Sequence, residues 1–266
     1  MPFPATMEAQ SSLRLSPAWC LRQTLDAMDD VGTRALLRGV LAASAGGIEV
    51  EGARRLAEIP DPAIFALTHH NAFEALLAPA ALMALRGGRL VRFLVDWMYL
   101  ELPLAGRLLR HGQPIPVYRK AARWRWRESR RREGLRGASP AERALAALAG
   151  GTSIGIYPEG RRNADPWKLA PLRRGAAELA LRSGAPLLPI GIRFPARERL
   201  GRLPRLGRMI LSVGEPLTTA ELHLRAAAAE PFDASAQPGI ARRHAAELSR
   251  ALVLSLAHLA RKSTCS

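Results

Sequence analysis

Short continuous apolar runs alternate with stretches of helical spacing along most of the chain. Residues 63–67, 152–157 and 187–192 are runs too short for helices, and Gly or Pro bounds most of them, so they predict buried strands. Ile48-Glu49-Val50, which follows Gly46-Gly47, is expected to be a further strand. The apolar stretch from Ala75 to Leu85 predicts a helix. Strands that alternate with helices favour an α/β fold with a largely parallel central sheet flanked by helices, in a single domain.

Both ends of the chain are expected to be helical. Between Leu13 and Ala45 apolar residues recur at helical spacing, and Gly46-Gly47 ends this pattern. Beyond Pro216, helices are expected around Thr219–Ala229 and Gly239–Lys262. We therefore expect three parts: N-terminal amphipathic helices at 1–46, which cover the sheet or lie on a membrane, a core at 47–216, and C-terminal helices that pack on the core at 217–266.

Composition sets the class of protein. With 266 residues and 48% hydrophobic content, the chain can bury one large core. The longest uncharged run, Ala144–Pro158, is shorter than the about 20 apolar residues that a spanning helix needs, so no transmembrane helix is expected. Cys20 and Cys265 form no motif, which indicates reduced thiols, and the N-terminus lacks the pattern of a signal peptide. These features lead us to expect that the protein lies in the cytosolic compartment.

A first group of candidate catalytic residues follows the run at 63–67, in the segment Thr68-His69-His70-Asn71-Ala72-Phe73-Glu74. A neutral imidazole is the usual general base for an alcohol nucleophile, and a carboxylate on its far nitrogen fixes the tautomer. His69 and Glu74 can meet only if His69 precedes the helix and Glu74 lies in its first turn. Three other interpretations stay open: a capping box from Asn71 to Glu74, a rival dyad of His70 and Glu74, and a metal site of all three side chains, which lacks a recognised spacing.

A second group follows the run at 152–157, in the segment Ile156-Tyr157-Pro158-Glu159-Gly160-Arg161-Arg162-Asn163. Gly160 allows close approach of the backbone, and the arginines supply forked donors that suit phosphate. Arg119 ends a further predicted strand, Pro114–Tyr118. An arginine-rich chain also carries such residues on solvated faces without function.

Four blocks in this order resemble the glycerolipid acyltransferase superfamily, whose best-known members are 1-acyl-glycerol-3-phosphate acyltransferases. The blocks are His69 to Glu74, Ile115 to Arg119, Tyr157 to Arg162, and Leu187 to Ile190, and the resemblance runs from about Ile48 to Pro216. The segment Arg173–Ala180 also looks like the family's segment between its third and fourth blocks. Glu74 stands where the family has Asp, and Arg161 where it has Thr.

The resemblance implies an O-acyltransferase that moves a fatty acyl group from acyl-CoA or acyl-carrier protein to a hydroxyl of a lipid. It implies no cofactor and no metal. His69 and Glu74 would be catalytic, and the acceptor's phosphate would be held by substrate-binding residues of the second and third blocks: Arg119, Glu159, Gly160, Arg161 and Arg162. Glu159 would orient the arginines more plausibly than touch an anion. The expected acceptor is 1-acyl-glycerol-3-phosphate, in phospholipid biosynthesis; an ornithine lipid, a glycolipid or a pigment glycoside is the alternative.

The formal charge of +16 indicates how such a protein reaches lipid. Arginine-rich surfaces are attracted to anionic headgroups, so we expect a peripheral protein on the cytoplasmic face of the inner (plasma) membrane. The densest run is Arg119–Arg136, where Trp124 and Trp126 lie between arginines. Aromatic residues near Phe93 and Trp97 are expected either to contact lipid or to pack in the core. A basic lipid- or nucleic-acid-binding protein without catalysis is the alternative of another class, although no nucleic-acid-binding motif is found.

Overall fold

The computed structural model describes residues 12–71, 74–103, 105–119, 121, 125–163, 165, 167–195, 208–218 and 238–264, apart from the side chains of 105, 108, 126, 127 and 238–242. In this part of the chain the strands form one eight-stranded sheet with the order β1-β2-β8-β7-β3-β6-β4-β5. The strands are β1 Ser12–Arg14, β2 Ile48–Glu51, β3 Ile64–Leu67, β4 Val91–Asp96, β5 Ile115–Val117, β6 Ser153–Ile156, β7 Leu187–Arg193 and β8 Met209–Val213.

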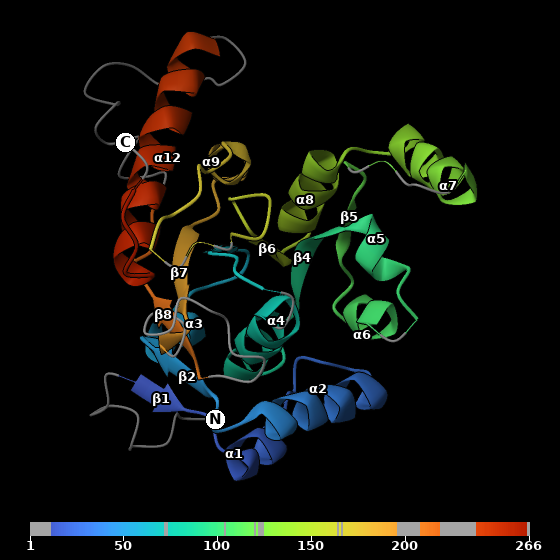
Figure 1. Cartoon of the computed structure of the whole chain (residues 1–266), viewed down its shortest axis with the longest axis vertical. Helices are drawn as coiled ribbons and strands as arrows, with labels where there is room; N and C mark the ends of the chain where they lie inside the picture. Colours follow the sequence, from blue (N-terminus) through green and yellow to red (C-terminus); the bar gives the residue numbers. More distant parts are fainter. Residues whose placement is uncertain are drawn as a thin grey trace.

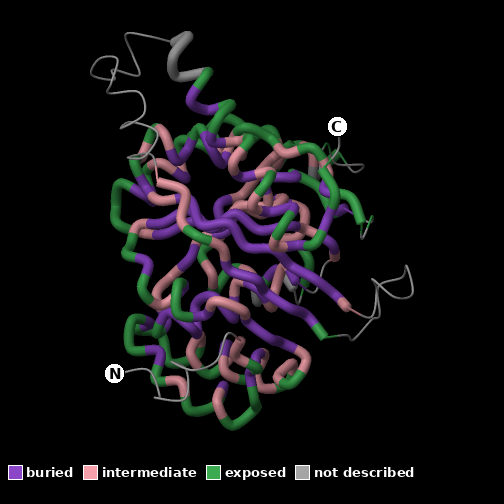
Figure 2. Tube along the Cα trace, turned by 90° about the vertical axis from the view of Figure 1, so that its left-hand side faces the viewer, coloured by how far each residue is buried: buried purple, intermediate pink, exposed green. Residues whose placement is uncertain are grey.

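The predicted α/β fold with a largely parallel sheet is confirmed. Strands β2/β8, β3/β6, β3/β7, β4/β5 and β4/β6 pair in parallel, whereas β1/β2 and β7/β8 are antiparallel. Central β3 is buried along its whole length, as its uninterrupted apolar sequence requires. Figure 2 shows the buried strands running through the middle of the molecule between more exposed outer segments.

Helices cover both faces of the sheet (Figure 1). They are α1 Pro17–Arg22, α2 Val31–Ser44, α3 Ala53–Glu58, α4 Glu74–Leu85, α5 Trp97–Leu100, α6 Ala105–His111, α7 Arg125–Arg136, α8 Pro140–Ala149, α9 Gly175–Ser183 and α12 Pro238–Leu259. Buried residues of α1 to α4 form one hydrophobic cluster with the sheet, and those of α8, α9 and α12 form a second. The sheet therefore separates two cores.

The ends of the chain differ in part from the expectation. Helices α1 and α2 lie in the predicted N-terminal segment, but Ser12–Arg14 pairs with β2 as an edge strand, which helical spacing did not indicate. Helix α12 packs on β7 and α9, in agreement with a C-terminal helix on the core. The expected helix at 219–229 lies outside the described residues. The division at 46 and 216 stays a prediction.

No helix in the described part of the chain is long and apolar enough to span a membrane. Cys20 is a buried free thiol, and Cys265 lies outside the described residues.

Candidate active site

Parallel pairing of β3 and β6 brings the two sequence groups together. Ala66 pairs with Ile156, so His69 and Glu159 each lie three residues beyond a matched pair, at the carboxyl edge of the sheet. On the other side of β3, Ile192 N–H donates to Thr68 Oγ1 over 2.8 Å, which fixes the end of the strand. Carboxyl ends of neighbouring parallel strands are the usual place for a site in such sheets.

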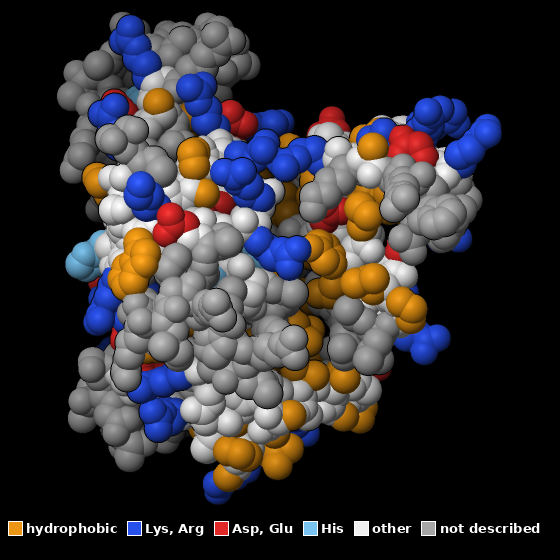
Figure 3. Space-filling view, in the orientation of Figure 1, with side chains coloured by type: hydrophobic (Ala, Val, Ile, Leu, Met, Phe, Trp, Pro, Cys, Tyr) orange, Lys and Arg blue, Asp and Glu red, His pale blue; other side chains and the backbone are white. Residues whose placement is uncertain are grey.

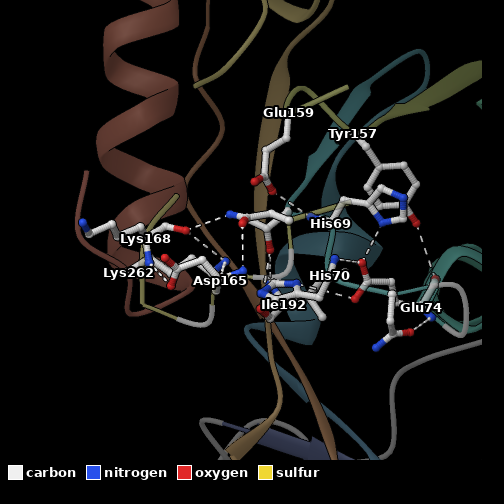
Figure 4. Close-up of polar contacts among 12 residues, drawn as sticks. His69, His70, Glu74, Tyr157, Glu159, Asp165, Lys168, Ile192 and Lys262 are labelled. Atoms are coloured by element: carbon white, nitrogen blue, oxygen red, sulfur yellow. Dashed lines mark hydrogen bonds and ion pairs between the residues drawn. The ribbon is translucent and has the colours of Figure 1, made fainter. Parts of the chain in front are cut away.

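His69 and Glu74 are in contact. His69 Nδ1 lies 2.7 Å from Glu74 Oε1 (Figure 4). The helix start makes this possible, because Asn71 Oδ1 accepts a hydrogen bond from Glu74 N–H over 3.1 Å and α4 begins at Glu74. The Glu74 carboxylate turns back toward the histidines, where it also accepts from His70 N–H. The Asn71 side chain thus holds the start of α4, and the carboxylate of the first helical residue contacts the imidazole.

Burial distinguishes the two candidate dyads. The His69 side chain is 16% exposed, that of His70 is 4% exposed, and that of Glu74 is fully buried. His70 Nδ1 is 3.5 Å from Glu74 Oε2, and its ring packs edge-on against Phe194 with centroids 5.7 Å apart. His69 is therefore the histidine that a substrate can reach, and His70 packs behind it.

Glu74 is held as a carboxylate. Burial alone would favour its protonated form, but the contacts with His69 and His70 outweigh this effect and bring the pKa of Glu74 below its ordinary value. A charged carboxylate at Nδ1 keeps the proton of neutral His69 on that nitrogen. Nε2 then carries the free lone pair, as a general base requires.

Tyr157 supports the imidazole from one side. Its ring stacks on His69 with centroids 4.3 Å apart and planes inclined by 26°, and its hydroxyl donates to Glu74 O over 3.4 Å. Burial, followed by the negative charge of Glu74, raises the pKa of Tyr157 well above its ordinary value. Tyr157 therefore stays neutral and restricts the rotation of the imidazole.

The backbone of His69 is held by the loop that follows β6. His69 N–H donates to Glu159 Oε1 over 2.9 Å, and His69 O accepts from Asn163 N–H over 2.7 Å. The second oxygen of Glu159 accepts from Ala170 N–H over 3.2 Å, and the residue is 2% exposed. The Glu159 carboxylate therefore ties two backbone amides together, and no bond from it to an arginine is found among the described residues. Its expected role in acceptor binding stays a prediction.

Arg119 and Gly160 lie together as the sequence suggested. Arg119 Nη2 donates to Gly160 O over 3.5 Å. Gly160 has a φ of +63°, and a Cβ there would lie 2.4 Å from Nε of Arg173 and 3.5 Å from Nη1 of Arg119. The glycine therefore lets two guanidinium groups approach one stretch of backbone. That stretch directly follows Glu159, which binds the backbone of His69.

Arg161 and Arg162 are exposed on the same loop. Within the described part of the chain, no hydrogen bond or ion pair links either of them to His69, Glu74 or Arg119. Figure 3 shows Lys and Arg side chains gathered on this face between α12 and α8, with apolar side chains below and to the right of them. No group of three His, Cys, Asp or Glu side chains among the described residues has the geometry of a metal site.

Of the aromatic residues considered as lipid contacts, some are buried and others lie outside the described part of the structure. Phe93 and Trp97 are buried, and the Phe93 ring lies against Gly155 of β6, so both belong to the core. Trp124 lies outside the described residues, and the side chain of Trp126 is likewise not described.

Comparison with known proteins identifies the family. The model of the family described as "Acyltransferase" matches residues 47–193, more than half of the chain. The chain belongs to the acyltransferase family. A curated relative, the 1-acyl-sn-glycerol-3-phosphate acyltransferase of Bacillus subtilis (strain 168), is 34% identical over 85 residues, which cover 32% of this chain and 40% of the relative. The crystal structure of the 1-acyl-sn-glycerophosphate acyltransferase from Thermotoga maritima has a TM-score of 0.49 and 15% identity, covering 86% of this chain and 83% of that chain.

Two supports in this acyltransferase were not expected from its sequence. Arg173, which reaches Gly160, is the first residue of the segment Arg173–Ala180 that resembles the family's, but nothing in its spacing assigned it to the site. Asn163 lies at the end of the second group, yet its backbone bond to His69 depends on how the loop turns. A loop of irregular shape has no periodicity, so neither contact leaves a pattern in the sequence.

Proposed function

We propose that this acyltransferase moves a fatty acyl group from a thioester, acyl-CoA or acyl-carrier protein, to the hydroxyl of 1-acyl-glycerol-3-phosphate. The observation that carries the proposal is His69, whose Nδ1 lies 2.7 Å from a buried carboxylate while its side chain remains partly exposed. This arrangement suits the removal of a proton from an alcohol as it attacks a carbonyl. The curated relative is named for this reaction.

The proposed chemistry uses the chain's own side chains. His69 Nε2 accepts the proton of the acceptor hydroxyl while the oxygen forms a bond to the thioester carbonyl carbon. Glu74 stabilises the imidazolium that results, because its carboxylate stays ionised beside Nδ1. The tetrahedral intermediate collapses with cleavage of the carbon–sulfur bond, and the imidazolium returns its proton to the leaving thiolate. No acyl-enzyme is required.

Phosphate of the acceptor is assigned to the guanidinium groups around Gly160. Arg119 and Arg173 both approach that glycine, and exposed Arg161 and Arg162 continue the same loop. Arginine forks bind phosphate oxygens in pairs, so this cluster suits a phosphomonoester. The loop also carries Glu159, whose bond to His69 N–H joins this loop to the strand end that carries the proposed base.

An apolar cavity beside the first turns of α4 suits an acyl chain. It lies between α2, α4 and α6 and is lined mainly by aliphatic residues, among them Leu36, Val40, Leu76 and Met83. Ala75, the residue after Glu74, also lines it. The cavity is narrow, with about 60 Å³ open, so entry of a long chain requires the helices to separate.

Membrane association of this acyltransferase is part of the same proposal. Its substrate is a lipid, and the net charge of +16 favours contact with the anionic cytoplasmic face of the inner membrane. A second acceptor class, the ornithine lipids or glycolipids, is favoured by one observation: Arg161 adds a charge where the family has a hydroxyl.

A direct test measures acyl transfer by the purified full chain. Oleoyl-CoA and oleoyl-acyl-carrier protein serve as donors, and 1-acyl-glycerol-3-phosphate, lyso-ornithine lipid and a glycolipid as acceptors. We expect transfer to the phosphate-bearing acceptor, and loss of at least about 100-fold in kcat for His69→Ala, since a general base contributes about 10² to 10⁴. Near-normal turnover by His69→Ala would exclude the assigned mechanism, and transfer to another acceptor alone would reassign the substrate.

A further inference from the structure

A second cavity lies away from the dyad, between the sheet and the carboxyl end of α12. It has a volume of about 450 Å³ and is lined by Glu51, Ser212, Arg193, Ala257, His258, Leu259, Arg261 and Lys262. This size falls within the range of about 300–1,000 Å³ that is usual for small-molecule sites. None of these residues takes part in the proposed transfer, and the lining includes three cationic side chains, those of Arg193, Arg261 and Lys262.

Arg193 forms the inner wall of the cavity. It is the last residue of β7, and its side chain is 4% exposed. Its hydrogen bonds to other described residues all come from Nη2, which donates to Glu51 Oε1 over 2.8 Å, to Glu51 Oε2 over 2.9 Å and to Ser212 Oγ over 3.4 Å. Nε is buried and has no partner among the described residues. A buried guanidinium thus keeps unused hydrogen-bonding capacity beside a cavity.

The charges around the cavity do not balance. Arg193, Arg261 and Lys262 are three cations, and Glu51 is the one carboxylate in the lining, which leaves two positive charges in excess. Arg261 and His258 are exposed at the rim, whereas Lys262 is buried. Excess positive charge in a partly enclosed space attracts anions, and guanidinium forks favour the tetrahedral oxygens of phosphate.

We propose that this cavity binds the phosphate group of a soluble or lipid ligand. Arg261 and Arg193 would hold the phosphate oxygens from the rim and from the wall, and Ser212 would supply a hydroxyl. The shared chemistry is a phosphate group, and its source is inorganic phosphate, a phosphate ester such as coenzyme A, or an anionic headgroup.

The cavity is connected to His69 by a chain of hydrogen bonds (Figure 4). Lys262 Nζ donates to Asp165 O over 2.8 Å and to Lys168 O over 3.4 Å. Asn163 Nδ2 donates to the same Lys168 oxygen over 2.7 Å, and Asn163 N–H donates to His69 O. A ligand that holds the segment of Arg261 and Lys262 in place would therefore steady the loop on which His69 rests. This consequence, unlike the binding itself, rests on the proposed function.

The first experiment measures binding with no need for activity. The melting temperature of the full chain is recorded against increasing inorganic phosphate, coenzyme A and vesicles of phosphatidylglycerol, for wild type, Arg261→Gln and Arg250→Gln. Arg250 is exposed on α12 and does not line the cavity, so its variant removes the same charge elsewhere. We expect saturable stabilisation of wild type and Arg250→Gln by at least one probe, and about 10-fold weaker binding by Arg261→Gln.

The outcomes separate the sources and can overturn the proposal. Competition between phosphate and coenzyme A, weakened in Arg261→Gln, would identify a phosphate ester, whereas stabilisation by vesicles alone would identify a headgroup. Absence of a saturable effect from all three probes, or equal binding by the two variants, would disprove the site. A second variant, Lys262→Met, should lower kcat with little change in the acceptor's KM if transfer occurs. Binding without any acyl transfer would keep the site and reject only the proposed function.

Discussion

At the scale of single residues, the contact between His69 and Glu74 depends on the position of the Glu74 carboxylate at the start of α4. Glu74 is the first residue of α4, and its longer side chain bridges to His69 Nδ1 over 2.7 Å. The family pattern has Asp at this position. An Asp side chain has one methylene fewer, so from the same backbone position its carboxylate would not reach as far toward the imidazole.

Two substitutions of Glu74 test its role as the group that orients His69. Glu74→Gln removes the charge that stabilises the imidazolium, so we expect kcat to fall by about 10²- to 10⁴-fold. Glu74→Asp keeps the charge and shortens the arm, and we expect an intermediate loss of about 10-fold or more. Steady-state kinetics with the thioester in excess measures both changes.

His70→Gln is the matched control for the dyad, because His70 contacts the same carboxylate from a buried position. Its kcat should fall far less than that of the Glu74 variants. A loss as large as that of His69→Ala would instead support the rival dyad of His70 and Glu74.

At the scale of elements, the sequence predicted those strands and helices that have a hydrophobic periodicity or a capping residue. The buried strands and the helix that follows Asn71 agree with the structure. Edge strand β1 and antiparallel β8 did not stand out, since short edge strands obtain much of their stability from partners distant in sequence. The sequence also could not show that Glu159 binds backbone amides, because that contact joins residues 90 positions apart.

The loop after β6 offers a test of the guanidinium cluster. In Gly160→Ala the new Cβ would lie 2.4 Å from Arg173 Nε, so Arg173 must move, and a φ of +63° adds backbone strain of about 1–2 kcal/mol. We expect the KM for the acceptor to rise about 10-fold, with a smaller effect on the KM for the thioester. Kinetics with each substrate varied in turn measures this difference.

Gly151→Ala provides the control for backbone strain alone. Gly151 has a φ of +77°, and a Cβ there would meet nothing within 4 Å. It should lower stability by a similar amount and leave the acceptor's KM unchanged. An equal rise in KM for both variants would show that strain, and not the position of Arg173, causes the effect.

At the opposite end of β3 and β6, an ion pair stabilises the elements that carry the site. Arg86, fully buried at its side chain and stacked over Phe65 at 4.9 Å, donates to Asp61 Oδ1 over 2.6 Å, and the Ser153 hydroxyl also donates to that oxygen. Asp61→Asn would leave a buried guanidinium without its counter-ion, at a cost of about 3 kcal/mol in unfolding free energy. Urea denaturation measures this loss. The control is Glu58→Gln, which removes the exposed partner of Arg54 and should cost less than about 0.5 kcal/mol in unfolding free energy.

The same ion pair gives a pH dependence with a defined sign. Burial raises the pKa of Asp61, but the hydrogen bonds from Ser153 and Arg86 outweigh it, so the folded-state pKa lies below the ordinary value of about 3.9. The stabilisation is therefore complete above that value and is lost as the pH falls through the lowered pKa. The difference in stability between wild type and Asp61→Asn should stay constant from pH 7 to about pH 5 and shrink below pH 4. A difference that grows on acidification would contradict this assignment.

At the scale of the whole molecule, the proposed contact with anionic lipid depends on where the basic side chains lie on the surface. Helix α7 carries a dense part of the charge, and it is linked to the neighbourhood of Arg119. Arg131 Nη1 donates to Tyr118 O over 3.3 Å, and Gly134 lies against the Tyr118 ring. A membrane that binds α7 would therefore lie close to the residue proposed to hold the acceptor's phosphate.

Vesicle flotation tests this arrangement. The side chains of Arg130 and Arg132 are 63% and 74% exposed, and each basic residue near an anionic surface contributes about 1 kcal/mol. We expect the full chain to float with phosphatidylglycerol vesicles at low salt and to dissociate in about 0.5 M NaCl, where screening shortens the range of the attraction. The double variant Arg130→Gln/Arg132→Gln should bind the vesicles about 10-fold more weakly. The control is the double variant Arg54→Gln/Arg250→Gln, which removes two exposed arginines from α3 and α12 and should bind nearly as well as the wild type. An equal loss of vesicle binding in both double variants would mean that total charge, and not α7, drives binding. Stronger binding to nucleic acid than to vesicles would favour the alternative of a nucleic-acid-binding protein without catalysis.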